Sequence, residues 1–144
     1  MAGAMEAALE LSTRYASDRV QFGRAIAKFQ AIQQQLALLA EQAAAASVAV
    51  EYAAIAVAAG RPSVAFAIAA AKIRAGEAAG KVAEIAHQVH GAIGFTHEHR
   101  LHRLTRRLWS WRDEFGTESH WSRELGRGLM TAGVDALWPM ITTG

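Results

Sequence analysis

The sequence has no cysteine and only two prolines among its 144 residues. The absence of cysteine excludes a disulfide scaffold, a cysteine-ligated zinc site and a cysteine nucleophile. Aromatic residues make up only 8% of the chain, and the formal net charge of +2 is small for a nucleic-acid binder, so we expect no nucleic-acid partner. Hydrophobic residues nevertheless reach 52%, which excludes intrinsic disorder and is enough for the core of one domain.

Alanine is the residue that the sequence has in excess. Of its 33 alanines, 31 lie at or before Ala92. Abundant alanine with scarce proline and few β-branched clusters favours long helices over a β-sandwich or a β-barrel. The second half of the chain carries most of the chemistry, because seven arginines lie between Arg100 and Arg127 and all six histidines lie between His87 and His120.

The sequence shows no secretory signal and predicts no membrane span. The first six residues lack the basic region and the leucine-rich stretch of a secretory signal. The most apolar segment, Ala43 to Ala59, is mostly alanine and contains Glu51, which is costly in a bilayer. We therefore expect no membrane span and a cytoplasmic location.

Apolar residues recur at helical spacing in three segments of the first two thirds of the chain. They predict helices over about residues 1–18, 29–59 and 64–89, the last two with long seams of alternating three- and four-residue steps. The apolar positions are Ala4, Ala8, Leu11 and Tyr15; Phe29, Ile32, Leu36, Leu39, Ala43, Ala46 and Val50; and Val64, Ile68, Ala71, Ala75, Ala78, Val82, Ile85 and Val89.

Glycine and proline mark the predicted ends of these helices. Gly23 is a natural stop for the first helix. Gly60 ends the second and Pro62 opens the third in its first turn, so this short connection predicts an antiparallel hairpin of two long helices. Seams of this length predict packing on more than their own hairpin, either in an oligomer or against further domains.

Two breaks divide the remainder of the chain. The segment 91–95 interrupts the helical pattern before a shorter helix with Leu101, Leu104, Leu108 and Trp111 inward, and a second break falls at Phe115–Gly116. Thr117 is the predicted N-cap of a last helix, with Glu118 at the positive end of the helix dipole. The sequence thus predicts an all-α, antiparallel up-down bundle of four to five helices over residues 1–130 and a frayed tail over 131–144.

The motifs that suggest metal or nucleotide chemistry are weak. The zincin pattern would need a histidine at position 101, where the chain has leucine after His97 and Glu98, so we expect no metal site. The chain has no GxGxxG, Walker or GxSxG motif.

We expect Trp109, Trp111 and Trp121 to pack in the core rather than to form a stacking surface. The carboxylates Asp113 and Glu114 precede a helix break, where either a general base or an acidic residue near a cap can stand.

Two stretches together resemble the C-terminal domain of the acyl-CoA dehydrogenases. The first runs from Tyr15 to Arg24 (YASDRVQFGR) and continues in residues 29–33 (FQAIQ). The second is QVHGAIGFT, residues 88–96. Both occur in the family's order with fitting spacing, and the resemblance extends from about Gly3 to Leu129.

The resemblance implies an oligomeric flavoprotein that oxidises an acyl-CoA thioester between its α and β carbons. FAD would take the hydride, and an electron-transferring flavoprotein would reoxidise the cofactor. Full-length members also carry an N-terminal helical domain and a middle β-domain, so the chain is expected to be a fragment or an isolated domain, inactive alone. Members are usually tetramers built through this bundle, with each FAD shared between subunits; here the oligomer is expected to contain either identical or different subunits.

The resemblance also assigns residues to the cofactor site. Arg19 matches the arginine that reaches the FAD phosphates, a role that suits the planar guanidinium fork. Gly91 matches a glycine that permits close backbone approach to the cofactor. The further matched positions are Gln21, Phe22 and Thr117 near the flavin, Phe29 and Gln30 near the adenine, Gln88 along the diphosphate part, and Gly116 beside the substrate.

One departure from the family concerns the catalytic base. The family glutamate falls on Phe115, and the tyrosine before it falls on Glu114. Because one residue turns a side chain by about 100° along a regular helix, only one of the two would face a common pocket there. Three alternatives remain for the base: it is Glu114, it is a residue upstream of this chain, or it is absent. Two functions stay open: a dehydrogenase domain that helps form an active flavin site, and a non-catalytic partner subunit or assembly module.

Overall fold

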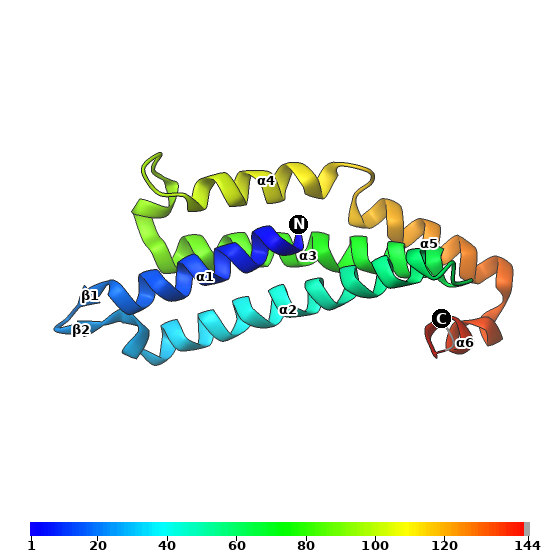
Figure 1. The fold of residues 1–144 in the computed structure, drawn as a ribbon, viewed down its shortest axis with the longest axis horizontal. Helices are drawn as coiled ribbons and strands as arrows, with labels where there is room; N and C mark the ends of the chain where they lie inside the picture. The colour runs from blue at the N-terminus through cyan, green and yellow to red at the C-terminus, as the bar shows by residue number, and fades with distance from the viewer. Residues whose placement is uncertain (143–144) are drawn as a thin grey trace.

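The structure is a computed structural model, which describes residues 1–142 as an elongated helical bundle (Figure 1). It confirms the all-α architecture that the sequence predicts. In chain order the elements are α1 (Ala2–Asp18), β1 (Val20–Gln21), β2 (Arg24–Ala25), the 3₁₀ turn η1 (Ile26–Lys28), α2 (Gln30–Ala58), α3 (Val64–His90), η2 (Gly91–Phe95), α4 (Leu101–Asp113), α5 (Glu118–Ala132), η3 (Val134–Ala136) and α6 (Leu137–Thr142).

The long helix α3 is the centre of the bundle. It packs antiparallel to α2 along their shared length and also contacts α1, α4 and α5. The two shorter helices α4 and α5 follow one another along α3, so together they take the place of a fourth antiparallel helix (Figure 1). This position explains why α3 is buried on several sides, whereas α5 has no fully buried residue.

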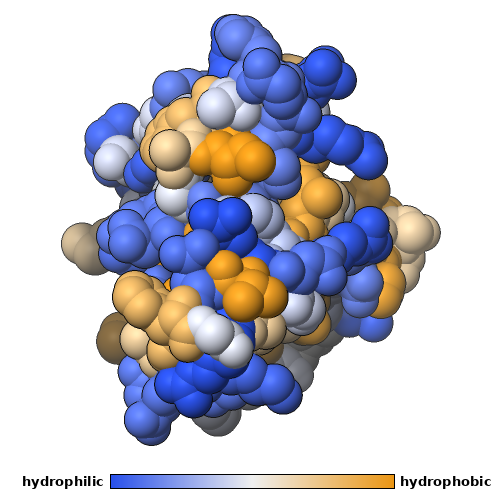
Figure 2. Space-filling view, turned by 90° about the vertical axis from the view of Figure 1, so that its left-hand side faces the viewer, coloured by the Kyte–Doolittle hydropathy of each residue, from blue (hydrophilic) through white to orange (hydrophobic). Residues whose placement is uncertain are grey.

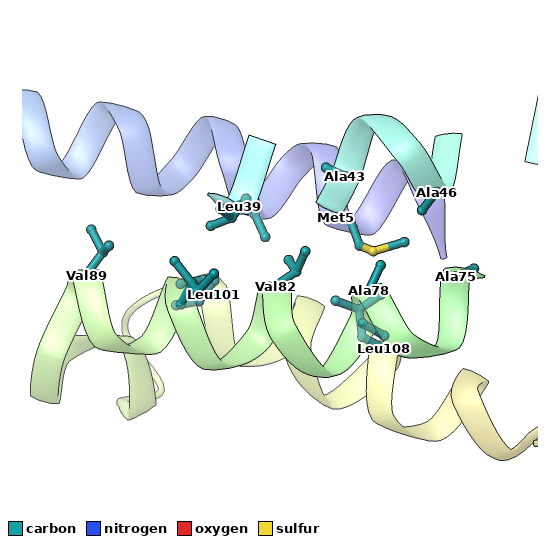
Figure 3. Packing of buried hydrophobic residues seen from close by; sticks show 14 of the residues in the cluster. Met5, Leu39, Ala43, Ala46, Ala75, Ala78, Val82, Val89, Leu101 and Leu108 are labelled. Carbon is teal, nitrogen blue, oxygen red and sulfur yellow. The ribbon is translucent and has the colours of Figure 1, made fainter. Parts of the chain in front are cut away.

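The core is built from small side chains with a few large ones between them. Alanines from α2 and α3 let the two helices approach closely, and Met5, Leu39, Val82, Leu101 and Leu108 fill the space between α1, α2, α3 and α4 (Figure 3). In a second, smaller cluster near the α2–α3 turn, the buried residues are all alanines, Ala53, Ala56, Ala67 and Ala71. The predicted seams are confirmed except at Val50, which is exposed because the contact stripe of α2 shifts to the second cluster.

Two predicted boundaries need correction. Gly23 does not stop a helix: α1 ends at Asp18, and Gly23 forms with Phe22 the two-residue turn of a small hairpin that pairs Gln21 with Arg24. Both turn residues have positive φ, which matches the twist of the paired strands. Pro62 lies before α3 and not in its first turn.

The C-terminal segment is ordered into helix over most of its length. The structure shows η3 and α6 where the sequence predicts a frayed tail, although Trp138 and Ile141 of α6 remain exposed. The last two residues of that predicted tail, 143 and 144, lie outside the described residues.

Helix α2 is also long and apolar enough to cross a membrane by length and composition alone. Only 22% of its most apolar window is buried in this chain. The helix packs against α1 and α3 within the bundle and carries Glu41 and Glu51. Its apolar residues therefore lie partly on the packed face and partly on an exposed face.

Candidate functional site

The predicted site residues form two groups at two places on the bundle. The first group lies at the end where α1 and α3 finish, which carries the β1–β2 hairpin and η2 (Figure 1). The ring of Tyr15 stacks on that of His90 with 4.6 Å between the ring centroids, and this contact joins the two helix ends. The second group lies at the α4–α5 junction. Because α4 has 13 residues, it separates the groups by about 20 Å.

The hairpin presents its side chains to the surroundings. Arg19 is exposed, and its side chain makes no hydrogen bond or ion pair with any residue of 1–142, so its guanidinium is free for an anion. Phe22 is 91% exposed with a φ of 52°, a conformation that non-glycine residues rarely adopt. Its ring meets that of Phe29 edge to face at 6.1 Å, and the Arg24 guanidinium lies 4.2 Å from the centroid of the Phe29 ring. Arg24 ends the first signature stretch, but its sequence position predicted no role for it.

The rest of the first group is open in the same way. Gln30 and Gln88 are exposed at the start of α2 and in the last turn of α3. Gly91 has a φ of 64°, and a Cβ placed on it would meet nothing within 4 Å. An extended group can therefore approach the Gly91 backbone without obstruction. Figure 2 looks onto this end of the molecule and shows hydrophobic patches between hydrophilic side chains.

The second group is held by backbone bends at the α4–α5 junction. Phe115 has a φ of 59° and Gly116 a φ of 98°, so the chain leaves the helix before it enters α5. The indole nitrogen of Trp121 donates a hydrogen bond of 3.0 Å to the Phe115 carbonyl, which ties this bend to α5. Thr117 is the N-cap, as predicted: its hydroxyl accepts from the His120 backbone N–H at 3.4 Å.

Glu114 and Phe115 line one cavity together. This cavity has a volume of about 440 Å³, and its other lining residues are Met1, Ile68, Lys72, Trp111 and Trp121. The expectation that only one of the two faces a common pocket applied to regular helix, and it does not apply here because Glu114 is extended and Phe115 has a left-handed backbone. Glu114 is exposed and accepts a hydrogen bond of 2.9 Å from the Ser110 hydroxyl, and Phe115 is 90% exposed.

A half-buried ion pair beside this cavity fixes the junction. The Arg112 Nε donates to Glu118 at 2.6 Å, and Lys72 donates to the carbonyls of Trp111 and Arg112 at the end of α4. Burial favours the neutral form of Glu118, but the hydrogen bond and charge of Arg112 outweigh it, so the pKa of Glu118 is lowered. Gly76 of α3 leaves the space that the Glu118 carboxylate occupies. This carboxylate is a structural anion, and sequence reasoning recognised only its position at the helix start.

Two of the six histidines, His87 and His90, are buried and serve as packing residues. His87 is buried, accepts or donates a 2.9 Å hydrogen bond with Thr105, and stacks on Phe95 with 4.0 Å between the ring centroids. His90 lies between Tyr15 and His99, and burial lowers the pKa of both His87 and His90. Within residues 1–142 no three His, Asp or Glu side chains lie close enough together to hold a metal ion.

The tryptophans only partly follow the prediction of core packing. Trp109 is 46% exposed at the edge of α4, which makes that prediction wrong for this residue. Trp111 and Trp121 are partly buried, and both line the cavity at the junction. The wall of this cavity is therefore largely apolar and aromatic, with Lys72 and Glu114 as its charged members.

Comparisons with known proteins give one consistent family. Residues 1–129 match the family described as acyl-CoA dehydrogenase, C-terminal domain. The 3-sulfinopropanoyl-CoA desulfinase of Paraburkholderia xenovorans is 45% identical over 104 residues, which cover 72% of this chain and 26% of the desulfinase. The butyryl-CoA dehydrogenase structure from Megasphaera elsdenii superposes with a TM-score of 0.84 at 33% identity, over 90% of this chain and 33% of that chain.

A third relative is an assembly of two named components. The ChsE4–ChsE5 complex from Mycobacterium tuberculosis superposes with a TM-score of 0.82 at 30% identity, over 88% of this chain and 34% of that chain. The chain thus spans between a quarter and about a third of the length of the relatives it matches. From the bundle, the order of its two signature stretches and the match over residues 1–129, the chain belongs to the acyl-CoA dehydrogenase family, in its C-terminal helical domain.

Proposed function

We propose that this chain is the C-terminal domain of an FAD-dependent acyl-CoA dehydrogenase, contributing cofactor contacts and an oligomer interface. The observation that carries this proposal is the pair of open residue groups at the two ends of α4. Each group is incomplete by itself, and together they are too far apart to hold the same end of one cofactor. A cofactor that is shared between subunits would contact one such group in each of two subunits.

The residues of the first group fit the adenosine diphosphate part of FAD. The free guanidinium of Arg19 offers parallel donors to phosphate oxygens, and the open backbone at Gly91 admits a close neighbour. The ring of Phe29, with Arg24 on its face, offers an aromatic surface for the adenine. When bound, FAD supplies a hydride acceptor for the dehydrogenation.

The second group would face the reacting end of the acyl-CoA. Abstraction of the α-proton needs a carboxylate within reach of it, and Glu114 is the only carboxylate among the described residues that line the junction cavity. Its carboxylate would accept the proton once a bound substrate replaces solvent around it and raises its basicity. Gly116 and Thr117 would position the neighbouring cofactor and substrate.

A non-catalytic role is the second candidate, and Phe115 favours it. This phenylalanine stands where the family has its base, and it cannot accept a proton. One structural relative is a complex of two named components, ChsE4 and ChsE5. In this alternative the chain serves a hetero-oligomer as a partner subunit or assembly module, and a base from another subunit completes the reaction.

The remaining partners follow from the reaction. We propose an electron-transferring flavoprotein as the oxidant of the reduced cofactor, and a second subunit against the exposed apolar face of α2. Leu38, Val48 and Ile55 lie on that face. A cytoplasmic location is part of the same proposal.

The test uses the full-length, flavin-loaded protein that carries this chain. If Glu114 is the base, Glu114→Gln lowers turnover by about 10²–10⁴-fold while the FAD content is unchanged. Unchanged turnover in Glu114→Gln excludes this base and supports the partner role. In that case Phe115→Glu, which restores a carboxylate at the family position, tests whether this subunit's cavity can support proton abstraction.

A further inference from the structure

A cavity lies toward the end of the bundle opposite the β1–β2 hairpin, between the start of α3, helix α5 and the short helix α6 (Figure 1). Its volume is about 620 Å³, within the range of small-molecule sites. Among the described residues, Trp121 is the only one that lines both this cavity and the cavity at the α4–α5 junction. This tryptophan therefore forms the wall between the two spaces.

Small residues of α3 and α5 create the space. Ala65 and Ala69 line it from α3, and Gly128 lines it from α5. A Cβ placed on Gly128 would meet no atom within 4 Å, so the space extends to the backbone of α5. Because α3 and α5 pack on each other elsewhere along their length, the cavity is a gap within a formed helix interface.

The walls of the cavity are mainly apolar. Phe66 and Trp121 supply aromatic rings, Leu125 and Met140 supply apolar chains, and all four residues are half-buried. Met140 belongs to α6, which packs mainly on η3 and so closes one side of the cavity with few contacts to the core. Walls of this composition favour the transfer of an apolar molecule from water.

One polar group of the wall has no partner. Ser63 is only 8% exposed, and its hydroxyl makes no hydrogen bond with any described residue. It stands at the N-cap position of α3, where a serine ordinarily accepts a hydrogen bond from the first helical turn, yet it makes no such bond. A buried hydroxyl without a partner is unfavourable. Because Ser63 lines the cavity, rotation about its side-chain bond can turn this hydroxyl toward a ligand there.

The charges around the cavity favour a neutral ligand. Glu124 is the only carboxylate among the described lining residues, and it already pairs with Arg127 at 2.5 Å. An anionic ligand would meet this carboxylate, with no lysine or arginine in the described lining to balance it. A cationic ligand would compete with Arg127 for the same carboxylate. The exposed ring of His120 packs on Trp121 and offers a second hydrogen-bonding group at the rim.

We propose that the cavity between α3, α5 and α6 binds a neutral, mainly apolar small molecule that hydrogen-bonds Ser63 through a hydroxyl or carbonyl group. The apolar walls supply the affinity, and the unpartnered hydroxyl selects a ligand with one polar group. The site goes beyond the proposed function, because none of the residues matched to the cofactor or to the base lines this cavity.

The first experiment records ¹H–¹⁵N spectra of the 144-residue protein while 2-naphthol, a neutral bicyclic probe with one hydroxyl, is added. We expect saturable shifts of the Trp121 indole and Gly128 amide signals. Gly128→Leu, which places a side chain in the cavity, should weaken binding about tenfold or more. The matched control Gly126→Leu adds the same side chain to α5 at a position that does not line the cavity, and should leave the affinity unchanged. Circular dichroism verifies that both variants keep their helices.

Two further probes test the chemistry of the ligand. Ser63→Ala should weaken 2-naphthol binding about three- to tenfold and leave the affinity for naphthalene, which lacks the hydroxyl, unchanged. Equal weakening of both probes would overturn the hydrogen bond to Ser63. The anion 2-naphthoate should bind more weakly than 2-naphthol, and equal or tighter binding overturns the assignment to a neutral ligand. No binding of 2-naphthol at millimolar concentration overturns the whole proposal.

A second experiment uses the full-length, flavin-loaded protein. Retained 2-naphthol binding, with an unchanged KM for acyl-CoA in Gly128→Leu, supports a separate site. Loss of binding in the full-length protein would show that another part of the protein fills the cavity, and a raised KM in Gly128→Leu would assign the cavity to the substrate; either result overturns the proposal. If the protein binds 2-naphthol here but has no dehydrogenase activity, the proposed function fails and this site stands.

Discussion

Gly76 of α3 lies directly beneath the carboxylate of Glu118, the first residue of α5. A Cβ at Gly76 would overlap the carboxylate oxygen and come within 2.6 Å of the carboxyl carbon. Because Glu118 also pairs with Arg112 at the end of α4, this one glycine lets three helices meet at the junction that carries Glu114 and Phe115. The absence of a side chain on α3 thus helps to determine the geometry of the candidate site.

Substitution Gly76→Ala should destabilise the protein despite the better helix propensity of alanine. The Glu118 carboxylate can make room only by moving away from Arg112, so overpacking costs about 1–3 kcal/mol, and the propensity gain returns about 0.5–1 kcal/mol. The expected net loss is measured by urea denaturation. Gly126→Ala in α5 is the matched control, since a Cβ there meets nothing within 4 Å and should stabilise the protein. Equal stabilisation by both substitutions would contradict the contact.

Substitution Glu118→Gln should lower the free energy of unfolding by about 1 kcal/mol at neutral pH, because it removes the charge-assisted hydrogen bond from Arg112. The folded-state pKa of Glu118 is below its usual 4.5, so its contribution is complete above that pH and is lost as the pH falls through the folded-state value. The difference between the two proteins in urea denaturation should therefore shrink in acid.

The control for this prediction is Glu124→Gln. Glu124 pairs with Arg127 on the exposed side of α5, where an ion pair contributes little. A loss of stability in Glu124→Gln as large as that in Glu118→Gln would show that the junction pair has no special role.

Substitution His90→Phe should flatten the dependence of stability on pH in mild acid. Burial, with the neighbouring His99 and His87, keeps the pKa of His90 below 6.5 despite the hydrogen bond to Ala86. The unfolded chain therefore takes up a proton first, so the free energy of unfolding is greatest above pH 6.5 and decreases as the pH falls through the folded-state value. Denaturation series with His97→Phe as the exposed control measure the slope, and an unchanged slope in His90→Phe refutes this account.

The protein should self-associate through the exposed face of α2. Val48 is 65% exposed there, between Leu38 and Ile55, and apolar patches on long helices mark interfaces. We expect Val48→Glu to reduce the mass measured by light scattering without changing the unfolding midpoint of the monomer. Val134→Glu, an exposed valine outside α2, should leave the mass unchanged. A monodisperse wild-type monomer would rule this interface out.

The 144-residue protein should bind no FAD tightly by itself. Its two groups of matched residues are exposed and lie about 20 Å apart along α4, so neither encloses a cofactor. Absorbance spectroscopy after incubation with FAD and gel filtration measures the retained flavin. Retention near one FAD per chain would contradict the prediction, and the full-length protein serves as the loaded reference.

Much of the fold could be predicted because the spacing of apolar residues and the residues at helix ends indicate helices locally. The steps of three and four residues gave the α2–α3 hairpin, and Thr117 was recognisable as a cap from its place at the break. Residues whose role depends on contacts across elements were not predictable in this way. Arg24 lies in the first signature stretch, but its contact with the Phe29 ring could not be read from the sequence, and no pattern pointed to Lys72 on the end of α4.

The sequence by itself determined the long helices, their breaks and the two signature stretches, because each depends on residues close together in the chain. Only the tertiary structure decided how Glu114 and Phe115 share one cavity and how Glu118 finds its place over Gly76. The first depends on a left-handed backbone at Phe115, and the second joins residues 42 positions apart on different helices. Such contacts arise from the packing of whole helices, which a periodic pattern along one helix does not encode.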